Sequence, residues 1–333
     1  MRATTFQFRV SGATLAAIVL ALACRHDDRR KPEPVQSGRY SQLGVIAWLG
    51  SDRVVFRRVD KYGSGDALET TCDSAGLYIA DVTGHISPWS TGERLCSVLR
   101  ASDDVSLSGD RRELLYAVKD GGGALHRFDI QNQTDHEVVV GCADVRTPVW
   151  MPTGKRIAFT GACSGSKGFT LYLVNADGSG GRAIGAAANG QDKSYPTWSA
   201  DGRALAVQQG QLSSSASIVV VDTATGEQHR IASGVLPAWN PTDDVVAYLD
   251  VDSTSMAEPS LHLVRVDGSG DRRIFRDSIP PALSRHGGRW LTGPPIWSAD
   301  GQWLAFANQS GVWIVNVNGT NLHAIVGQSS AIP

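Results

Sequence analysis

One short sequence motif occurs twice in the chain, about a hundred residues apart, and it constrains the fold more than any other feature. PTWSADGRALAV stands at residues 196–207 and PIWSADGQWLAF at residues 295–306. Related words begin at Pro148, Pro237 and Val105, and a further copy at Ile46 needs a one-residue deletion. Similar words at such a spacing are typical of a repeated structural unit. The copies are anchored at Trp48, Leu107, Trp150, Trp198, Trp239 and Trp297.

Four of the six copies carry a large–small–large apolar triplet with alanine in the middle at a fixed distance from the anchor, whereas Val55 and Leu115 take the middle position in the other two. Leu205-Ala206-Val207 and Leu304-Ala305-Phe306 are two examples. A second apolar run and a short third run complete the unit. Several second runs are followed by Asp-Gly or Asn-Gly, dipeptides that suit a tight hairpin turn. Since the runs are apolar on consecutive residues, both faces of each sheet should be buried.

These features together predict an all-β fold, a six-bladed β-propeller of four-stranded antiparallel blades. One such sheet cannot bury both faces alone, whereas six sheets around an axis cover one another. The propeller should span 44–327 and leave a short tail at 328–333. The blades are expected at about 44–92, 103–140, 146–185, 194–232, 235–276 and 293–327. All six units run from first to fourth strand, so ring closure stays open, with 35–43 or 328–333 as a candidate clasp.

The first residues have the pattern of an export signal. Residues 1–23 combine Arg2 and Arg9 with an uncharged apolar run, and Cys24 follows small residues. This resembles a bacterial lipoprotein signal, in which Cys24 is lipidated; an ordinary secretory signal is the alternative. Residues 24–43 are charged and contain two prolines, so they are predicted to form a lipid-anchored flexible tether.

The repeat also carries a family resemblance. The pattern P-x-W-S-x-D-G, then a hydrophobic–Ala–aromatic triplet and a strand ending in Asp-Gly, resembles the propeller of the periplasmic TolB family. The resemblance covers roughly residues 44–326. It implies a propeller in the cell envelope, on the periplasmic or outer-membrane side, and a partner of the peptidoglycan-associated lipoprotein type. Related propellers also occur in peptidases and polysaccharide lyases. The α/β domain that precedes the TolB propeller is expected to be absent, since only the tether precedes the first blade.

The remaining four cysteines fit two local disulfides. On the blade scheme Cys72 lies in the loop between the second and third strands of blade one, and Cys96 in the connection to blade two. Cys142 lies in the connection into blade three, and Cys163 in the loop between the second and third strands of that blade. Their segments emerge on the same face of a propeller, which favours the pairs Cys72–Cys96 and Cys142–Cys163 and an oxidising compartment. The two other pairings and a metal site are the alternatives.

The face that carries the cysteines also carries the longest insertions, 58–75 and 276–295, so binding is expected there. The candidate binding residues are Arg285, His286, Arg289 and Trp290 in the second insertion, and Asp144, Arg146, Asp192, Lys193 and Tyr195 at the mouth of the central channel. Trp290 is either an interface anchor or a packing residue. The charges at the channel mouth either bind a ligand or form the hydrated lining of the channel.

Patterns for other chemistry are weak. Gly161-Ala-Cys163-Ser-Gly165 has the spacing of a nucleophile elbow but lacks the following helix. The segments at Asp177 and Asp267 lack the closing Glu of a calcium loop and are better explained as hairpin turns. No cofactor, metal or catalytic residues are expected. A net charge of −2 gives no basic surface for nucleic acid.

Two functions follow from these observations. The favoured one is a lipid-anchored envelope propeller that binds another envelope protein through its long-loop face and contacts the membrane only through its lipid. The alternative is a propeller enzyme, a lyase or hydrolase, that acts on an envelope or extracellular polysaccharide. A propeller that binds a small molecule is the third hypothesis.

Overall fold

The computed structural model describes residues 38–64, 67–102, 104–118, 123–138, 140–163, 166, 168–185, 191–211, 216–250, 260–274, 291–308 and 310–327. These residues belong to one compact unit that begins at Gly38. The predicted signal, Cys24 and most of the tether lie outside the described residues, and so does the tail at 328–333.

The described strands form six sheets of four strands each, and every sheet is built from consecutive strands. Blade one holds β1 (Gly38–Leu49), β2 (Arg53–Ser64), β3 (Ala67–Asp81) and β4 (Ile86–Thr91). Helix α1 (Glu93–Ala101) follows. Blade two holds β5 (Val105–Leu107), β6 (Glu113–Ala117), β7 (Leu125–Asp129) and β8 (Thr134–Val138). Blade three holds β9 (Cys142–Trp150), β10 (Arg156–Cys163), β11 (Thr170–Asn175) and β12 (Arg182–Ile184).

The last three blades follow the same plan. Blade four holds β13 (Lys193–Trp198), β14 (Ala204–Gln209), β15 (Ser217–Asp222) and β16 (Gln228–Ser233). Blade five holds β17 (Val235–Trp239), β18 (Val245–Asp250), β19 (Ser260–Arg265) and β20 (Arg272–Arg273). Blade six holds β21 (Ile296–Trp297), β22 (Trp303–Asn308), β23 (Gly311–Asn316) and β24 (His323–Gly327).

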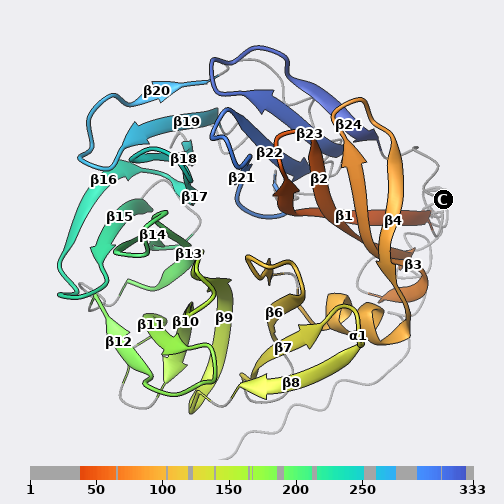
Figure 1. Ribbon diagram of the computed structural model, residues 1–333, viewed down its shortest axis with the longest axis horizontal. Helices are drawn as coiled ribbons and strands as arrows, with labels where there is room; N and C mark the ends of the chain where they lie inside the picture. The colour runs from red at the N-terminus through yellow and green to blue at the C-terminus, as the bar shows by residue number, and fades with distance from the viewer. Residues whose placement is uncertain are drawn as a thin grey trace, which may run out of the picture. The chain divides into compact units, whose positions relative to one another are not determined.

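The six sheets stand around a common axis (Figure 1), which confirms the predicted six-bladed propeller. The first strands of the blades are innermost, and each contacts the first strand of the next blade around the full circle. The small residue of each triplet lies where neighbouring blades approach closely. Ala158, Ala206, Ala247 and Ala305 are all fully buried. A larger side chain there would force the blades apart, because interiors are close-packed.

The ring closes without a strand exchanged between the first and last blades. Trp48 of β1 donates its Nε1–H to the carbonyl of Ile296 in blade six, at 2.9 Å. The same bond joins blades five and six, where Trp297 Nε1 donates to the carbonyl of Ala238 at 2.9 Å. Closure therefore uses an ordinary blade-to-blade contact, and residues 38–43, the described part of the candidate clasp 35–43, pair with β2 inside blade one.

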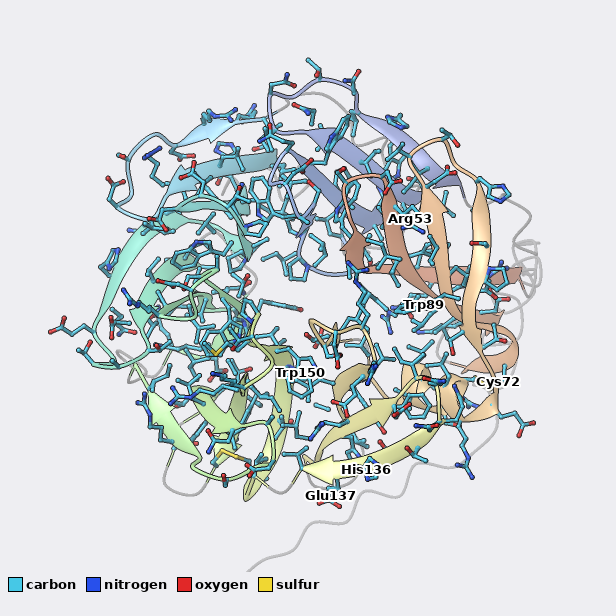
Figure 2. The ribbon with its side chains drawn as sticks, viewed as in Figure 1. Arg53, Cys72, Trp89, His136, Glu137 and Trp150 are labelled. Atoms are coloured by element: carbon cyan, nitrogen blue, oxygen red, sulfur yellow. A yellow bond between two sulfur atoms is a disulfide. The ribbon has the colours of Figure 1, made fainter. Side chains whose placement is uncertain are left out.

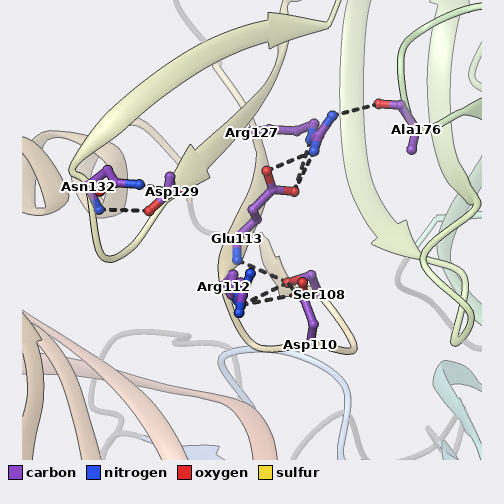
Figure 3. A network of polar contacts seen from close by, with 8 residues as sticks. All are labelled: Ser108, Asp110, Arg112, Glu113, Arg127, Asp129, Asn132 and Ala176. Carbon is purple, nitrogen blue, oxygen red and sulfur yellow. Dashed lines mark hydrogen bonds and ion pairs between the residues drawn. The ribbon is translucent and has the colours of Figure 1, made fainter.

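The Ser-x-Asp-Gly word turns the first strand of a blade into the second. Blade two has the related sequence Ser108-Gly-Asp110-Arg111. There the hydroxyl of Ser108 donates to Asp110 Oδ1 at 2.7 Å, and the N–H of Glu113 donates to Ser108 Oγ at 3.0 Å (Figure 3). The Ser108 hydroxyl, with the N–H of Arg112, holds the pKa of Asp110 below its ordinary value. The same hydroxyl–carboxylate bond recurs between Ser199 and Asp201 and between Ser298 and Asp300.

The Asp-Gly words form hairpin turns between third and fourth strands, as predicted. In blade three the N–H and the hydroxyl of Ser179 both donate to Asp177 Oδ1, at 2.9 and 2.7 Å. Gly178 has φ of 88°, a left-handed conformation that glycine adopts without strain. The carboxylate is thus used to fix the turn. Among the described side chains, no group of three or more His, Cys, Asp or Glu residues is placed to hold a metal ion.

Blade one departs from the repeat in two ways. Strand β1 begins at Gly38, inside the segment predicted as a tether, because 38–43 pair with the long strand β2. The predicted loop 58–75 is largely a hairpin in which Asp60 pairs with Thr71 and Ser64 with Ala67. The first insertion is therefore an extension of the blade-one sheet.

Helix α1 occupies the connection from blade one to blade two. It buries Leu95, Cys96, Val98 and Leu99, and this spacing puts them on one face of a helix. The disulfide Cys72–Cys96 fastens it to β3. It is the only helix in the described part of the chain, where no helix is long and apolar enough to cross a membrane.

Candidate functional site

The face of the ring at which the first strands begin is called the loop face below; β9 starts there at Cys142 and β13 at Lys193. A cavity of about 140 Å³ lies among the first strands. Blades one to four and blade six all contribute to it. Its polar lining comes from Arg57, Asp104, Ser106, Thr147, Tyr195 and Thr292.

Two residues of the cavity lining, and a third at the equivalent position of blade five, have backbone angles that side chains rarely adopt. Thr147, Tyr195 and Leu236 stand three residues before the anchors of blades three, four and five, and their φ values are 46°, 51° and 54°. Positive φ is unfavourable for non-glycine residues, most of all for β-branched ones such as threonine. At each of the three positions the register between first and second strand shifts, which marks a β-bulge.

The bulges direct backbone donors sideways into the preceding blade. The N–H of Tyr195 donates to Thr147 Oγ1 at 3.2 Å, and the N–H of Leu236 donates to Gln208 Oε1 at 3.2 Å. Thr147 Oγ1 also lies 3.0 Å from Thr160 Oγ1. The strained backbone at these positions is thus held by hydrogen bonds between neighbouring blades.

Arg57 is a charged residue of the cavity that sequence reasoning missed. Its side chain is only 2% exposed, and Nη1 donates to the carbonyl of Ser102 at 2.9 Å and to that of Leu99 at 3.5 Å. Both carbonyls lie at the C-terminal end of α1, where a cation is favourable. A Cβ on Gly44 would lie 2.8 Å from Arg57 Nε, so the glycine leaves room for the guanidinium. The available signal was the pair Arg57-Arg58 directly after the buried triplet Val54-Val55-Phe56.

Three of the five residues predicted at the channel mouth come together on the loop face. Arg146 Nη2 lies 2.7 Å from Asp144 Oδ2, and its guanidinium stacks 3.8 Å above the ring of Phe169. The N–H of Phe169 donates to Asp192 Oδ1 at 2.9 Å. The side chains of Asp144 and Arg146 are 37% and 57% exposed. This cluster, called the Phe169 cluster below, is accessible to a partner.

The other two residues lie elsewhere. Tyr195 lines the central cavity. Lys193 does not reach the channel: it is 1% exposed, and its Nζ donates to the carbonyl of Gly185 at 2.7 Å and to Gln228 Oε1 at 2.6 Å, between blades three and four. Burial lowers the pKa of Lys193 to about 8. The sequence pattern places a residue at a strand end but does not fix which way its side chain turns.

The second predicted insertion supplied Arg285, His286, Arg289 and Trp290. All four lie outside the described residues, so their binding role stays a prediction.

Both predicted disulfides are present. Cys142 pairs with Cys163 and Cys72 with Cys96. Cys163 is therefore not a free nucleophile, and the elbow-like spacing around it has a structural explanation. Two disulfides indicate an oxidising compartment.

Comparisons with known proteins agree with the fold. No protein-family model and no curated protein matches the sequence, whereas many solved structures match. A protein described as TolB from Agrobacterium tumefaciens is 16% identical, with 87% of this chain and 91% of that chain covered and a TM-score of 0.57. TolB from Acinetobacter baumannii is 13% identical, with 86% of this chain and 80% of that chain covered and a TM-score of 0.55.

An oligogalacturonate lyase in complex with manganese is similar to nearly the same extent. It is 13% identical, with 81% of this chain and 87% of that chain covered and a TM-score of 0.53. Identities this low show the fold alone. The chain has a TolB-like six-bladed β-propeller, and its function has to be argued from the site.

Proposed function

We propose that the protein is a binding module that holds a protein partner on its loop face, with one side chain or chain end of the partner inserted in the central cavity. The size of the cavity carries this proposal. Pockets for small molecules usually measure about 300–1,000 Å³, whereas this cavity measures about 140 Å³. It suits a single anchor from a larger molecule, the rest of which would lie across the face.

The Phe169 cluster supports a protein partner at the same face. An exposed arginine stacked on an aromatic ring and paired with a carboxylate is a common element of protein interfaces, where arginine and aromatic residues are enriched. The partner that we propose is another cell-envelope protein, of the peptidoglycan-associated lipoprotein type. The oxidising compartment indicated by the disulfides is compatible with this location.

A photo-cross-linking experiment tests the proposal. Benzoylphenylalanine would replace Asp144 or Arg146 on the loop face, and, as a matched control, Arg203 on the opposite face, whose side chain is 86% exposed. We expect one envelope protein to cross-link from the loop-face positions and not from Arg203. A Tyr195→Ala substitution in the cavity should reduce the product strongly. Equal products from both faces, or none from the loop face, would contradict the proposal.

We further propose that Cys24 carries a lipid. A Cys24→Ser chain should then move from the membrane fraction to the soluble fraction, as measured by fractionation and immunoblotting. Unchanged membrane attachment would reject the lipid anchor and leave the binding module untouched.

The alternative is a propeller enzyme that acts on a polysaccharide, and the similarity to the oligogalacturonate lyase motivates it. If the protein is such an enzyme, it should cleave a polysaccharide such as polygalacturonate, with or without added Mn²⁺. The Tyr195→Ala substitution should then lower the rate of cleavage. Absence of cleavage products together with loop-face cross-linking favours the binding module.

A further inference from the structure

A second concave site lies beside blade two, apart from the central cavity. It is a groove of about 980 Å³ between helix α1 and strands β6 to β8, and it shares no lining residue with the cavity. Figure 1 shows α1 next to blade two, and Figure 2 shows Glu137 at the outer edge of that blade. The floor is apolar, with Val98, Phe128 and Val138 among its residues. Its volume is in the usual range for ligand sites.

One histidine in this groove is held in a fixed orientation. His126 Nδ1 lies 2.8 Å from Asp135 Oδ2, and the His126 ring stacks on Tyr116 with centroids 5.2 Å apart. Tyr116 donates its hydroxyl to the other oxygen of Asp135 at 3.0 Å. Because an ionised carboxylate only accepts, the proton of the neutral ring is on Nδ1, and Nε2 is an acceptor. Burial, with the charge of Asp135, raises the pKa of Tyr116, so this phenol stays a donor.

The same Tyr–Asp–His arrangement recurs in blade five, where both ring nitrogens of the histidine have partners within the blade. Tyr248 and His262 both bond to Asp271, at 2.9 and 3.0 Å. There the second nitrogen, His262 Nε2, lies 3.1 Å from Ser260 Oγ and is already used. In the described part of the chain His126 Nε2 has no such partner, and His126 lines the groove. The network therefore stabilises both blades, but only in blade two does it leave an acceptor facing a large groove.

The groove walls are rich in acceptors that have no cationic partner. Glu137 pairs with His126 across β7 and β8, so both side chains stand on the groove side. Among the described residues, neither Glu137 nor Asp135 forms an ion pair with a lysine or arginine. Arg94 of α1 is the cation at the rim, and its guanidinium already donates to the carbonyl of Gln133 at 3.0 Å. The groove thus presents two acceptor groups without a described partner, Glu137 and His126 Nε2, beside the carboxylate of Asp135, whose oxygens already accept from Tyr116 and His126.

We propose that this groove binds an extended peptide segment in which an arginine is flanked by apolar residues. The guanidinium would donate to Glu137, Asp135 and His126 Nε2, and the apolar neighbours would cover Val98 and Phe128. A guanidinium matches such a wall because it carries several donors in a fixed plane and keeps its charge. This second site goes beyond the proposed function, since it neither uses the central cavity nor depends on it.

Binding of a defined peptide tests this proposal. The probe is acetyl-Ala-Leu-Arg-Leu-Ala-amide, and its matched control replaces arginine with citrulline, which has nearly the same shape but no charge. Titration calorimetry with the disulfide-bonded protein should show saturable binding of the arginine peptide. The citrulline peptide should bind at least about tenfold more weakly, since charge-assisted bonds are lost.

Substitutions assign the binding to the groove. Glu137→Gln removes an exposed charge that makes no described hydrogen bond, so the fold is kept, and binding should weaken at least about fivefold. Asp135→Asn should weaken it as well. Asp271→Asn is the matched control because it disturbs the same network in blade five, away from the groove, and it should leave affinity unchanged. Equal binding of both peptides, or equal losses from Asp135→Asn and Asp271→Asn, would overturn the proposal.

Discussion

Some blade junctions are stabilised by contacts that belong to the sequence repeat, here called the regular part of the ring, and others by contacts that do not, here called the irregular part. At three blade junctions the anchor tryptophan donates its Nε1–H to a backbone carbonyl of the preceding blade; the donors are Trp48, Trp198 and Trp297. At the junction of blades two and three, Nε1 of Trp150 is buried without a partner in the described chain. There the guanidinium of Arg127 lies 5.4 Å from the Trp150 ring instead.

Arg127 replaces the missing bond with a clamp. It binds both carboxylate oxygens of Glu113, at 2.7 Å from Nη2, and donates from Nη1 to the carbonyl of Ala176 in blade three at 3.2 Å (Figure 3). Blade two is also the blade whose anchor is Leu107. Arg182 and Arg272 donate to the equivalent carbonyls of Thr223 and Val317, so what distinguishes the junction of blades two and three is the pairing of Arg127 with Glu113 and its position beside the Trp150 ring.

The same contrast holds between blades one and two. Their junction contains α1, the disulfide Cys72–Cys96 and the buried Arg57, none of which belongs to the repeat. The irregular part of the ring should therefore respond to single changes that the regular part does not experience.

Removal of the disulfide should have the largest effect. For a separation of 24 residues, loop-closure entropy predicts that Cys72→Ala with Cys96→Ala lowers the free energy of unfolding by about 3 kcal/mol. Amide hydrogen exchange should accelerate most in α1. The matched control, Cys142→Ala with Cys163→Ala, has a similar separation of 21 residues and should leave α1 protected. Equal exchange of α1 in both variants would show that the disulfide does not hold the helix.

Arg57→Met should cost about 2 kcal/mol. The methionine fills much of the volume but leaves the carbonyls of Ser102 and Leu99 without this donor, which offsets the gain from removing a buried charge. Chemical denaturation measures the loss. An unchanged midpoint would mean that the guanidinium is unnecessary for docking the helix.

A pair of tryptophan substitutions compares the two kinds of junction directly. Trp297→Phe loses ring area and a 2.9 Å hydrogen bond. Trp150→Phe loses ring area, leaves an aromatic ring next to Arg127 and removes a buried donor that has no described partner. We expect Trp297→Phe to be more destabilising by about 1 kcal/mol. Both residues are almost equally buried, so thermal denaturation of the two variants isolates the bond. Equal losses would contradict the assigned difference.

The sequence predicted the blades that follow the repeat well, because residues that recur at the same position of every copy occupy the same place in every blade. The anchors, the alanine column and the Ser-x-Asp-Gly turns are each a local pattern with one structural solution. Blade one was predicted less well. Helix α1 was missed although Leu95, Val98 and Leu99 have helical spacing, since a single short helix carries little weight among repeated strands.

The candidate site was predicted only in outline. Strand ends on the loop face could be identified, which brought Asp144, Arg146 and Asp192 into consideration. The direction of a side chain at a strand end depends on bulges such as the one at Tyr195, and nothing local in the sequence encodes a positive φ at a tyrosine. For that reason Lys193 was expected in the channel and is found between blades.

The smallest predicted effect concerns the two buried cations. Arg57 donates to two carbonyls at the end of α1, whereas the pKa of Lys193 falls to about 8 from an unfolded value of 10.5. Between these two values the unfolded chain binds the proton and the folded chain does not, so stability rises with pH. From pH 7.5 to 9 the gain should be about 1 kcal/mol. Lys193→Met should lack this gain. Urea denaturation at several pH values measures the free energy of unfolding of both proteins. If that free energy changed with pH in the same way in both, burial of Lys193 would not be what lowers the stability of the folded protein.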